Sequence, residues 1–253
     1  MEVKQIKFSY QNKPLIDNLS ISFKQNKITS IIGPNGSGKS TLLMLLSRIY
    51  KISAGDIYLD GKNIWNYKIK EFAKMVAVVH QKNQIYGDLN VKTIVGYGRL
   101  PYLNYHQNLS EEDYQIIDWA LKITNLKKYQ DHQIANLSGG QQQRVWIAMA
   151  LAQKTPILLL DEPTTYLDVK YQIEILNLIK QINNDYQMTI IMVHHDINQA
   201  INSSDEIVAM KNGAILFQGK PQEVISSSSL QKLYDYDLQV IDHNHQKIVL
   251  NYQ

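Results

Sequence analysis

Nine consecutive residues carry the clearest chemical pattern: Gly33, Pro34, Asn35, Gly36, Ser37, Gly38, Lys39, Ser40 and Thr41. Their spacing matches G-x-x-x-x-G-K-[ST], in which glycines allow successive backbone N–H groups to turn inward on a phosphate. Lys39 adds a positive charge that can reach the outer phosphates, and the Ser40 hydroxyl suits Mg²⁺. The alternative is an ordinary glycine turn, but an apolar strand at 28–32 and an apolar helix start at 42–46 supply the strand–loop–helix context of the motif. The sequence therefore predicts a nucleoside triphosphate site.

Acids and histidines follow two other apolar strands. Asp161 and Glu162 come directly after the strand at 157–160, and the His194–His195 pair follows the strand at 188–193. An isolated pair of carboxylates at a strand end usually faces water, but beside a triphosphate Asp161 can hold Mg²⁺ and Glu162 can polarise a water for in-line attack. The histidines could be metal ligands, but with no cysteine or third histidine nearby a contact with the γ-phosphate fits better.

Two further residues, Tyr10 and Gln81, each have two possible roles that the sequence does not decide between. Tyr10 ends the first predicted strand and is either a surface aromatic side chain or a group that stacks on adenine. Gln81 follows the apolar run at 75–79 and is either a solvated loop residue or a ligand-binding group at the sheet edge.

A small-residue helix at 145–153 is preceded by a distinctive loop: Leu137, Ser138, Gly139, Gly140 and Gln141. One interpretation is a serine N-cap followed by turn glycines. The other is a second anion site, in which a hydroxyl and two glycines stand at a helix N-terminus and the helix dipole attracts negative charge. The local chemistry does not choose between them.

Composition limits the classes of protein that fit. With 253 residues, 44% of them hydrophobic, one compact α/β domain with a modest subdomain is expected. A formal charge of +3 is too weak a field to argue for nucleic acid, and the absence of cysteine excludes disulfides and thiolate metal sites. The first five residues lack an apolar signal core, and no segment approaches about 20 apolar residues. We expect a cytosolic topology, with any membrane association made through a partner.

The elements expected to position these groups alternate between strands and helices. Alternating or continuous apolar runs predict further strands at 3–8, 15–23, 55–61 and 75–79. The uninterrupted run at 75–79 is typical of a central parallel strand covered on both faces. Asn212-Gly213 predicts the turn of a hairpin, and residues 221–253 are expected to form one or two short helices and a terminal strand pair.

Residues from about 82 to 136 carry no strong strand signal and are expected to form a helical insertion. Ser110 and the acidic residues after it predict the start of a helix that runs to about Ile123. Arg99 to Tyr105 is expected to be an exposed aromatic linker. In the helix predicted after Asp168, six apolar positions are expected to form one wide buried face: Ile173, Ile175, Leu176, Leu178, Ile179 and Ile182.

The order of these motifs over residues 2–220 resembles the ATPase subunit of an ABC transporter. The combination is far more specific than any single motif, because the Leu-Ser-Gly-Gly-Gln loop has no place in other phosphate-loop enzymes. The resemblance implies an α/β fold, with a phosphate-loop NTPase (RecA-like) core around a mainly parallel sheet, an antiparallel β subdomain and a helical insertion. It implies one ABC ATPase domain over 1–253: a catalytic core with an N-terminal β subdomain at 1–81 and 137–220, a helical subdomain at 82–136, and a short extension at 221–253.

The resemblance also assigns roles around the nucleotide. Tyr10 becomes the aromatic group that stacks on adenine, and residues 33–41 become the phosphate cradle. Gln81 becomes the sensor of Mg²⁺ and water that also couples to the membrane subunit.

The catalytic roles follow from the same resemblance. Asp161 becomes the Mg²⁺ carboxylate, beside the Ser40 hydroxyl, and Glu162 becomes the catalytic base. His195, rather than His194, matches the switch histidine, because the family pattern places His immediately before Asp.

Subunit organisation is implied as well. In this family Ser138, Gly139, Gly140 and Gln141 of one subunit contact the ATP that the phosphate loop of the other subunit holds. A head-to-tail homodimer with two ATP molecules is therefore expected, bound to integral-membrane permease subunits at the cytoplasmic side of a bacterial membrane. An extracytoplasmic siderophore-binding protein would join through the complex, and no nucleic acid is expected.

A narrower resemblance concerns the cargo. Gly87-Asp88-Leu89 and Gly96–Tyr102 look like the stretch after Gln81 in importers of iron(III) siderophores, with haem and cobalamin importers close by. Thr164–Asp168 and His195–Ala200 agree with this. The expected function is ATP hydrolysis that energises bacterial import of iron(III)-siderophore complexes. The alternatives are the same role for haem, cobalamin or a metal ion, and a soluble ABC ATPase that acts on nucleic acid or the ribosome.

Overall fold

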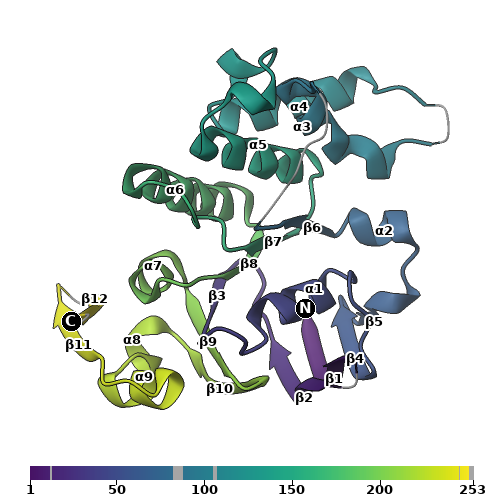
Figure 1. Ribbon diagram of the computed structural model, residues 1–253. Coiled ribbons are helices and arrows are strands. Elements are labelled where there is room, and N and C mark those ends of the chain that lie inside the picture. Colours follow the sequence, from purple (N-terminus) through teal and green to yellow (C-terminus); the bar gives the residue numbers. More distant parts are fainter. Residues whose placement is uncertain (12, 82–87, 105–106, 245, 251–253) are drawn as a thin grey trace. The chain divides into compact units, whose positions relative to one another are not determined.

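The computed structural model describes residues 1–11, 13–81, 88–104, 107–244 and 246–250 (Figure 1). They form two compact units, one of Met1–Tyr67 with Thr189–Gln253 and the other of Lys68–Met188. Three expectations fall partly outside the described residues: the first part of the helical insertion, the linker at Tyr105, and Gly87 in the cargo resemblance.

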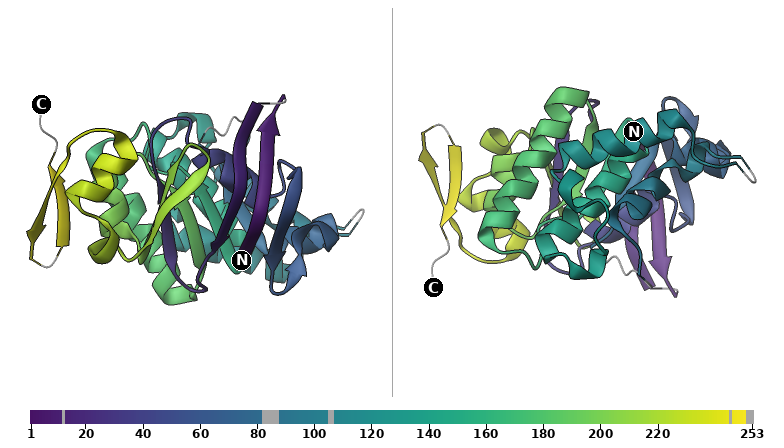
Figure 2. Two further views of the ribbon diagram at one scale, coloured as in Figure 1. Left: turned by 90° about the horizontal axis from the view of Figure 1, so that it is seen from below. Right: turned by 90° about the horizontal axis from the view of Figure 1, so that it is seen from above.

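The first unit begins with an antiparallel sheet in the strand order β2-β1-β4-β5 (Figure 2). Its strands are β1 (Glu2–Tyr10), β2 (Lys13–Ser22), β4 (Ala54–Leu59) and β5 (Lys62–Asn63), with a 3₁₀ turn at Ile64–Asn66. In β1 the side chains of Val3, Ile6 and Phe8 are buried and the positions between them are exposed. That pattern belongs to a sheet with one solvated face.

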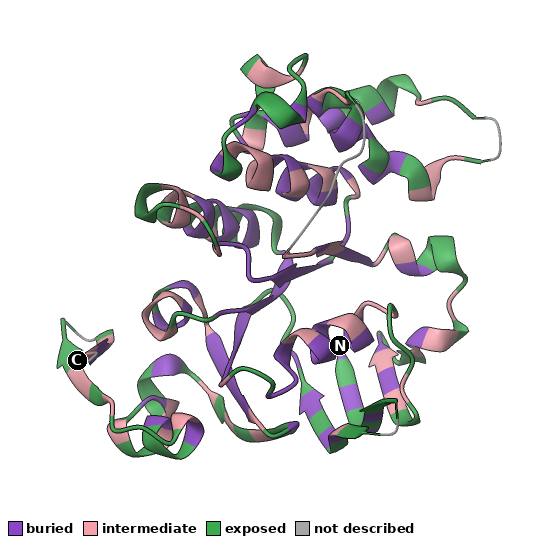
Figure 3. Cartoon of the chain, in the orientation of Figure 1, coloured by how far each residue is buried: buried purple, intermediate pink, exposed green. Residues whose placement is uncertain are grey.

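A second sheet of this unit carries the phosphate loop. β3 (Ile28–Ile32) lies parallel to β8 (Thr189–Val193) and β9 (Glu206–Lys211), and β10 (Ala214–Gly219) pairs antiparallel with β9. β3 and β8 are buried along their whole length (Figure 3). The phosphate loop and α1 (Lys39–Leu46) follow β3, while the His pair and α7 (Ile197–Ser203) follow β8. Parallel pairing therefore places the loop and the histidines at the same edge of this sheet.

The chain continues after β10 as predicted. It forms α8 (Pro221–Val224), α9 (Ser227–Tyr234) and the antiparallel pair β11 (Gln239–His243) and β12 (Gln246–Leu250). Asn212 and Gly213 turn the β9–β10 hairpin with φ of 48° and 75°, the conformation that an Asn-Gly turn supplies.

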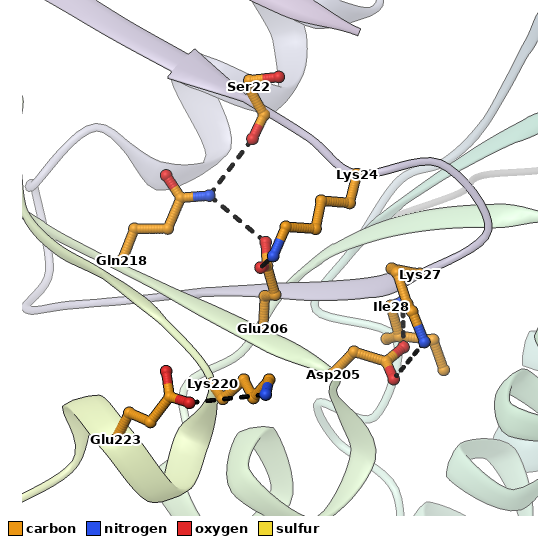
Figure 4. Close-up of polar contacts among 9 residues, drawn as sticks. All are labelled: Ser22, Lys24, Lys27, Ile28, Asp205, Glu206, Gln218, Lys220 and Glu223. Carbon is orange, nitrogen blue, oxygen red and sulfur yellow. Dashed lines mark hydrogen bonds and ion pairs between the residues drawn. The ribbon is translucent and has the colours of Figure 1, made fainter.

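Polar contacts fasten β9 and β10 to the end of β2 (Figure 4). The Glu206 side chain is buried and forms an ion pair with Lys24. Gln218 Nε2 donates to the Glu206 carboxylate at 3.4 Å and to the Ser22 carbonyl oxygen at 3.2 Å. The buried carboxylate is stabilised because charged and polar donors surround it.

The second unit contains two parallel strands and most of the helices. β6 (Val76–Val79) pairs with β7 (Ile157–Asp161) from Val76 opposite Ile157 to Val79 opposite Leu160. The α-helices are α2 (Ile69–Ala73), α3 (Val91–Gly96), α4 (Glu111–Ile123), α5 (Gly139–Ala152) and α6 (Val169–Tyr186), and 3₁₀ turns lie at Tyr97–Tyr102, Lys127–Tyr129 and Ile134–Asn136. The described residues between 88 and 136 contain α3, α4, the three 3₁₀ turns and one isolated bridge, but no strand.

The run at 75–79 was expected to be a central strand, and this is wrong. Among the described strands β6 stands at the end of its sheet, with β7 as its neighbour. Its apolar side chains are buried instead because α2 and α5 pack against it. A continuous apolar run therefore reports burial on both faces, and helices can provide that burial at a sheet edge.

The expectation of an exposed linker at 99–105 is also wrong at Arg99. The Arg99 side chain is buried, and its Nε donates to Asp113 Oδ1 at 2.8 Å. Its guanidinium also lies 3.9 Å from the ring centroid of Tyr102 and donates to the Ala152 carbonyl oxygen at 2.9 Å. Burial raises the pKa of Asp113, but hydrogen bonds from Ser110 and Arg99 outweigh it and hold that pKa below its ordinary value.

The buried face of α6 is narrower than predicted. Ile175, Leu176, Leu178, Ile179 and Ile182 are buried, whereas Ile173 is 55% exposed. Ile173 lies one turn before Leu176, near the N-terminal end of α6, and its side chain faces solvent.

The Arg99–Asp113 pair should contribute measurably to stability. Arg99→Met leaves the Asp113 carboxylate buried without its cation, and should lower the free energy of unfolding by about 3–5 kcal/mol in urea denaturation. Lys122→Met is the matched control, because it breaks an exposed pair with Asp118 and should cost less than about 1 kcal/mol. If both substitutions lowered the free energy of unfolding equally, the buried pair would stabilise the chain no more than the exposed one.

Candidate functional site

The phosphate loop adopts backbone conformations that suit glycine. Gly33, Gly36 and Gly38 have φ of 148°, 77° and 97°. A Cβ on Gly33 would lie 2.0 Å from the carbonyl oxygen of Met210, so the backbone of β9 closes directly against the start of the loop. A Cβ on Gly36 would meet nothing within 4 Å, so this glycine is required for its conformation rather than for space.

Lys39 places a cation inside the loop. Its side chain is buried, and Nζ donates to the carbonyl oxygens of Gly33 at 2.8 Å and Pro34 at 3.0 Å. Ser37 is buried too, and its Oγ has no hydrogen-bond partner among the described residues. The rest of the predicted cradle comprises the exposed Asn35, the half-buried Ser40 and the buried Thr41. A buried cation and an unsatisfied hydroxyl, beside an α1 N-terminus that Gly38 cannot cap with a side chain, are groups that a phosphate would satisfy.

Aromatic side chains stand beside the C-terminal end of this loop. Tyr10 is 43% exposed, and its hydroxyl lies 3.3 Å from Thr41 Oγ1. Its ring packs edge-on against Phe8 and Tyr50, with centroid distances of 4.8 Å and 5.6 Å. The partly exposed Tyr10 face is suited to stacking on a base. Tyr50 was not predicted to belong here, because its sequence neighbours carry no signal and only the fold brings it to Tyr10.

In the second unit, the acid pair ends β7. Asp161 is the last residue of the strand and is buried, and Glu162 follows with a φ of 50°. Gln81 Nε2 donates to Glu162 Oε2, and Thr165 Oγ1 donates to the same oxygen at 3.1 Å. The parallel pairing of β6 with β7 brings Gln81 to Glu162, as expected for groups at neighbouring strand ends.

The contacts of Glu162 are more informative than its backbone. Its left-handed conformation costs about 1–3 kcal/mol, but several other non-glycine residues of this chain, among them Asn18 and Lys154, share it. Two donors orient the Glu162 carboxylate, and an oriented carboxylate can accept a proton from water. Thr165 is an addition to the predicted site, because a threonine in a turn gives no signal until the turn places its hydroxyl on the carboxylate.

The loop before α5 is a capped helix N-terminus. Ser138 Oγ accepts from Gln141 N at 3.4 Å, and Gln141 Oε1 accepts from Ser138 N at 2.9 Å. Ser138 and Gly139 are exposed, and a Cβ on Gly139 would meet its nearest side chain at an ordinary 3.7 Å. A Cβ on Gly140 would lie 2.7 Å from the ring of Tyr171, so that glycine is required for packing. The N-cap interpretation is confirmed, and the anion site stays a prediction.

The two adjacent histidines have different environments. His194 is 1% exposed, its Nε2 lies 3.4 Å from Ser203 Oγ, and its Nδ1 has no partner among the described residues. Burial lowers the pKa of His194 to about 4. His195 is exposed at the edge where the phosphate loop follows β3, so its side chain is the accessible one. The part of the chain that the structure describes has no group of three or more His, Cys, Asp or Glu side chains that could hold a metal ion.

Comparison with known families decides what this arrangement is. The family model described as ABC transporter matches residues 16–165, which is more than half of the chain. The chain belongs to the ABC transporter family. The matched range includes the phosphate loop, Gln81, the Ser138 loop and the acid pair, so this chain is an ABC ATPase that binds ATP.

Relatives of this ABC ATPase are ATP-binding import proteins. It is 42% identical over 240 residues to the petrobactin import ATP-binding protein FpuC of Bacillus anthracis, covering 95% of this chain and 88% of that protein. It is also 42% identical over 241 residues to the iron(3+)-hydroxamate import ATP-binding protein FhuC of Bacillus subtilis, covering 95% and 90%.

Solved structures confirm the fold of this ABC ATPase. An inward-facing metal-chelate type ABC transporter is similar with a TM-score of 0.85 and 26% identity, covering 99% of this chain and 96% of that one. A dimeric ATP-binding cassette in a post-hydrolysis state with ADP and Pi is similar with a TM-score of 0.73 and 31% identity, covering 87% and 97%. The predicted α/β phosphate-loop NTPase fold with ABC architecture is therefore correct.

Burial of His194 predicts a pH dependence of stability in this ABC ATPase. Its pKa is about 4 in the folded chain, whereas an unperturbed histidine has a pKa of about 6.5. The unfolded chain takes up the proton first, so the free energy of unfolding should fall by about 3 kcal/mol in total as the pH drops from about 6.5 to about 4.

Urea denaturation at about pH 7.5 and about pH 4.5 measures this loss. His194→Gln should remove the contribution, and His243→Gln, at an exposed position, should leave it intact. A pH dependence that survives His194→Gln unchanged would assign the effect to other groups.

Proposed function

We propose that this chain is the ATP-hydrolysing subunit of a bacterial importer of iron(III)-siderophore complexes. The observation that carries the catalytic part is the Glu162 carboxylate, which Gln81 and Thr165 orient directly after β7. A surface carboxylate without such donors would be free to rotate, whereas two donors hold this one.

Residues 33–41 bind the triphosphate in this proposal. Lys39 Nζ exchanges its contacts with the Gly33 and Pro34 carbonyl oxygens for charge-assisted hydrogen bonds to phosphate oxygens, which are stronger. The α1 N-terminus and the Ser37 hydroxyl add donors to the same phosphates. The Tyr10 ring stacks on adenine and fixes the other end of the nucleotide.

Three side chains would hold Mg²⁺ on the nucleotide: Ser40, Gln81 and Asp161. Hydroxyl, amide and carboxylate oxygens are the hard ligands that this ion prefers. Gln81 uses its amide nitrogen on Glu162, so its amide oxygen is the group for the ion. When bound, Mg²⁺ neutralises the charge that develops on the transferred phosphoryl group.

Glu162 takes the proton of the attacking water, and His195 contacts the γ-phosphate from the end of β8. The exposed Ser138 and Gly139 at the α5 N-terminus contact the nucleotide that a second copy of the chain holds. This use of Ser138 supports a head-to-tail homodimer, and the similarity to a dimeric cassette with ADP and Pi agrees with it.

The proposed cargo and location rest on the sequence and its relatives. Residues 96–102 resemble iron(III)-siderophore importers, and the two relatives are import proteins for petrobactin and iron(3+)-hydroxamate. None of the described helices combines the length and the hydrophobicity that crossing a bilayer requires. In this proposal the dimer binds integral-membrane permease subunits at the cytoplasmic face, and a substrate-binding protein delivers the complex from the other side.

Glu162→Gln tests the base directly. The substitution keeps the shape of the side chain but removes the proton acceptor, so ATP turnover should fall by about 10²–10⁴-fold while the Kd for ATP stays within about twofold. Lys39→Ala should instead raise that Kd, because it removes the cation from the cradle. Phosphate release and fluorescent-nucleotide titration measure the two quantities. Normal turnover in Glu162→Gln would exclude Glu162 as the base.

Uptake measurements test the cargo. A strain that lacks the gene should lose uptake of radioactive iron from ferric siderophores, and the wild-type gene should restore it while the Glu162→Gln gene should not. Haem, cobalamin and divalent metal ions are supplied in parallel. Unchanged siderophore uptake together with loss of one of these would assign that cargo instead, and the ATPase measurement above would be unaffected.

A further inference from the structure

The segment after β10 packs into the core of the first unit rather than trailing from it. Leu230 and Leu233 of α9 and Val249 of β12 are buried in one cluster with Ile32, the last residue of β3, and Ala200 of α7. Figure 1 shows α9 and the β11–β12 pair in yellow at the end of the chain. This C-terminal segment, residues 226–250, therefore contacts the two elements that lead into the phosphate loop and out of the histidine pair.

One contact joins β12 to α7. The Asn198 side chain forms two hydrogen bonds with the backbone of Val249: its Nδ2 donates to the carbonyl oxygen at 3.0 Å, and its Oδ1 accepts from N at 2.9 Å. Asp196, which directly follows His195, caps the same helix by accepting from Gln199 N at 2.9 Å. The C-terminal segment is thus fixed to the helix that begins immediately after His195.

A second contact joins α9 to the phosphate loop. Tyr234 packs against the cluster that contains Ile32, the residue directly before Gly33, and its hydroxyl lies beside the Gly33 backbone. Burial raises the pKa of Tyr234 to about 12, so the hydroxyl stays neutral at ordinary pH. Lys211 Nζ donates to the Lys232 carbonyl oxygen at 2.6 Å and pairs with Asp235 at 2.7 Å, which fixes the end of α9 to β9.

We propose that the C-terminal segment is a clamp that positions both halves of the nucleotide site in this unit. Tyr234 fixes the first residue of the phosphate loop. Asn198 fixes α7, the helix that begins directly after His195 and Asp196. Both act through other residues and are positioning residues rather than catalytic ones. The inference rests on the proposed ATP hydrolysis. It assigns a role to Tyr234, which no sequence motif includes, and to Asn198, which the sequence connected only with the cargo.

The two contacts should affect different steps. The phosphate loop binds ATP before and after chemistry, so loosening Gly33 weakens binding. His195 is proposed to contact the γ-phosphate during hydrolysis, so loosening α7 slows turnover at saturating ATP. If the segment only stabilised the fold, its loss would reduce the fraction of folded enzyme. ATP binding and turnover would then fall together rather than separately.

The experiment compares three variants of the full chain. Tyr234→Phe keeps the ring and removes only the hydroxyl, and it should raise the Kd for a non-hydrolysable ATP analogue about three- to tenfold with kcat nearly unchanged. Asn198→Ala should lower kcat by about three- to tenfold with the Kd nearly unchanged. Asp242→Ala is the control, because it breaks the Lys247 pair inside the β11–β12 hairpin without touching α7 or the loop, and both quantities should match wild type.

Two results would overturn the clamp. One is wild-type Kd and kcat in both Tyr234→Phe and Asn198→Ala. The other is a parallel change of Kd and kcat in both variants that follows a fall in Tm, which would make the segment merely structural. Absence of hydrolysis in the wild-type chain would contradict the proposed function instead, and the effect of Tyr234→Phe on analogue binding would still decide for or against the loop contact.

Discussion

Gly33 lies so close to β9 that a Cβ would sit 2.0 Å from the Met210 carbonyl oxygen, and the rest of the nucleotide site depends on this approach. The β9–β10 turn that follows Met210 reaches the loop again, where Gly213 N donates to the Ser37 carbonyl oxygen at 3.0 Å. Gly213 in turn leaves no room for a side chain, because a Cβ would lie 1.6 Å from the Leu15 carbonyl oxygen of β2. Backbone of β9 and of the β9–β10 turn, which β2 supports from behind, therefore fixes a loop that must keep a buried lysine and inward-facing donors ready for phosphate. The Asn-Gly turn and the loop glycines are parts of one packing arrangement.

Close backbone packing also positions the groups around the acid pair in the second unit. Parallel pairing of β6 and β7 puts Gln81 and Glu162 at the same edge, and a short turn returns Thr165 to the carboxylate. Strand pairing and one turn thus orient the Glu162 carboxylate without any long loop. In each unit, polar groups that follow buried strands are positioned by the strands, so residues far apart in the sequence meet at one sheet edge.

Much of this could be predicted from the sequence because the relevant signals are local. Glycine spacing, strand-end acids and the Asn-Gly turn each identify their element within a few residues. Arg99 could not be placed, because a buried cation becomes plausible only when Asp113 and the Ala152 carbonyl oxygen are known to meet it. The edge position of β6 could not be predicted either. A strand covered by helices has the same continuous apolar sequence as a strand between two neighbouring strands. Tyr50 and Tyr234 reach the site only through tertiary contacts, so no spacing in the sequence marks them. Thr165 and Asn198 fall in stretches that the sequence connected with the cargo, and only the fold shows which groups they contact.

We propose that each ATP site needs a phosphate loop from one copy of the chain and the Ser138 loop from another. Mixing Lys39→Ala chains with Ser138→Arg chains tests it most directly, after urea denaturation has shown that both variants fold. Each variant alone should hydrolyse almost no ATP, whereas the mixture should regain activity, because a mixed dimer contains one site with both loops intact. Wild-type hydrolysis by Ser138→Arg alone, or a mixture as inactive as its components, would contradict the shared site.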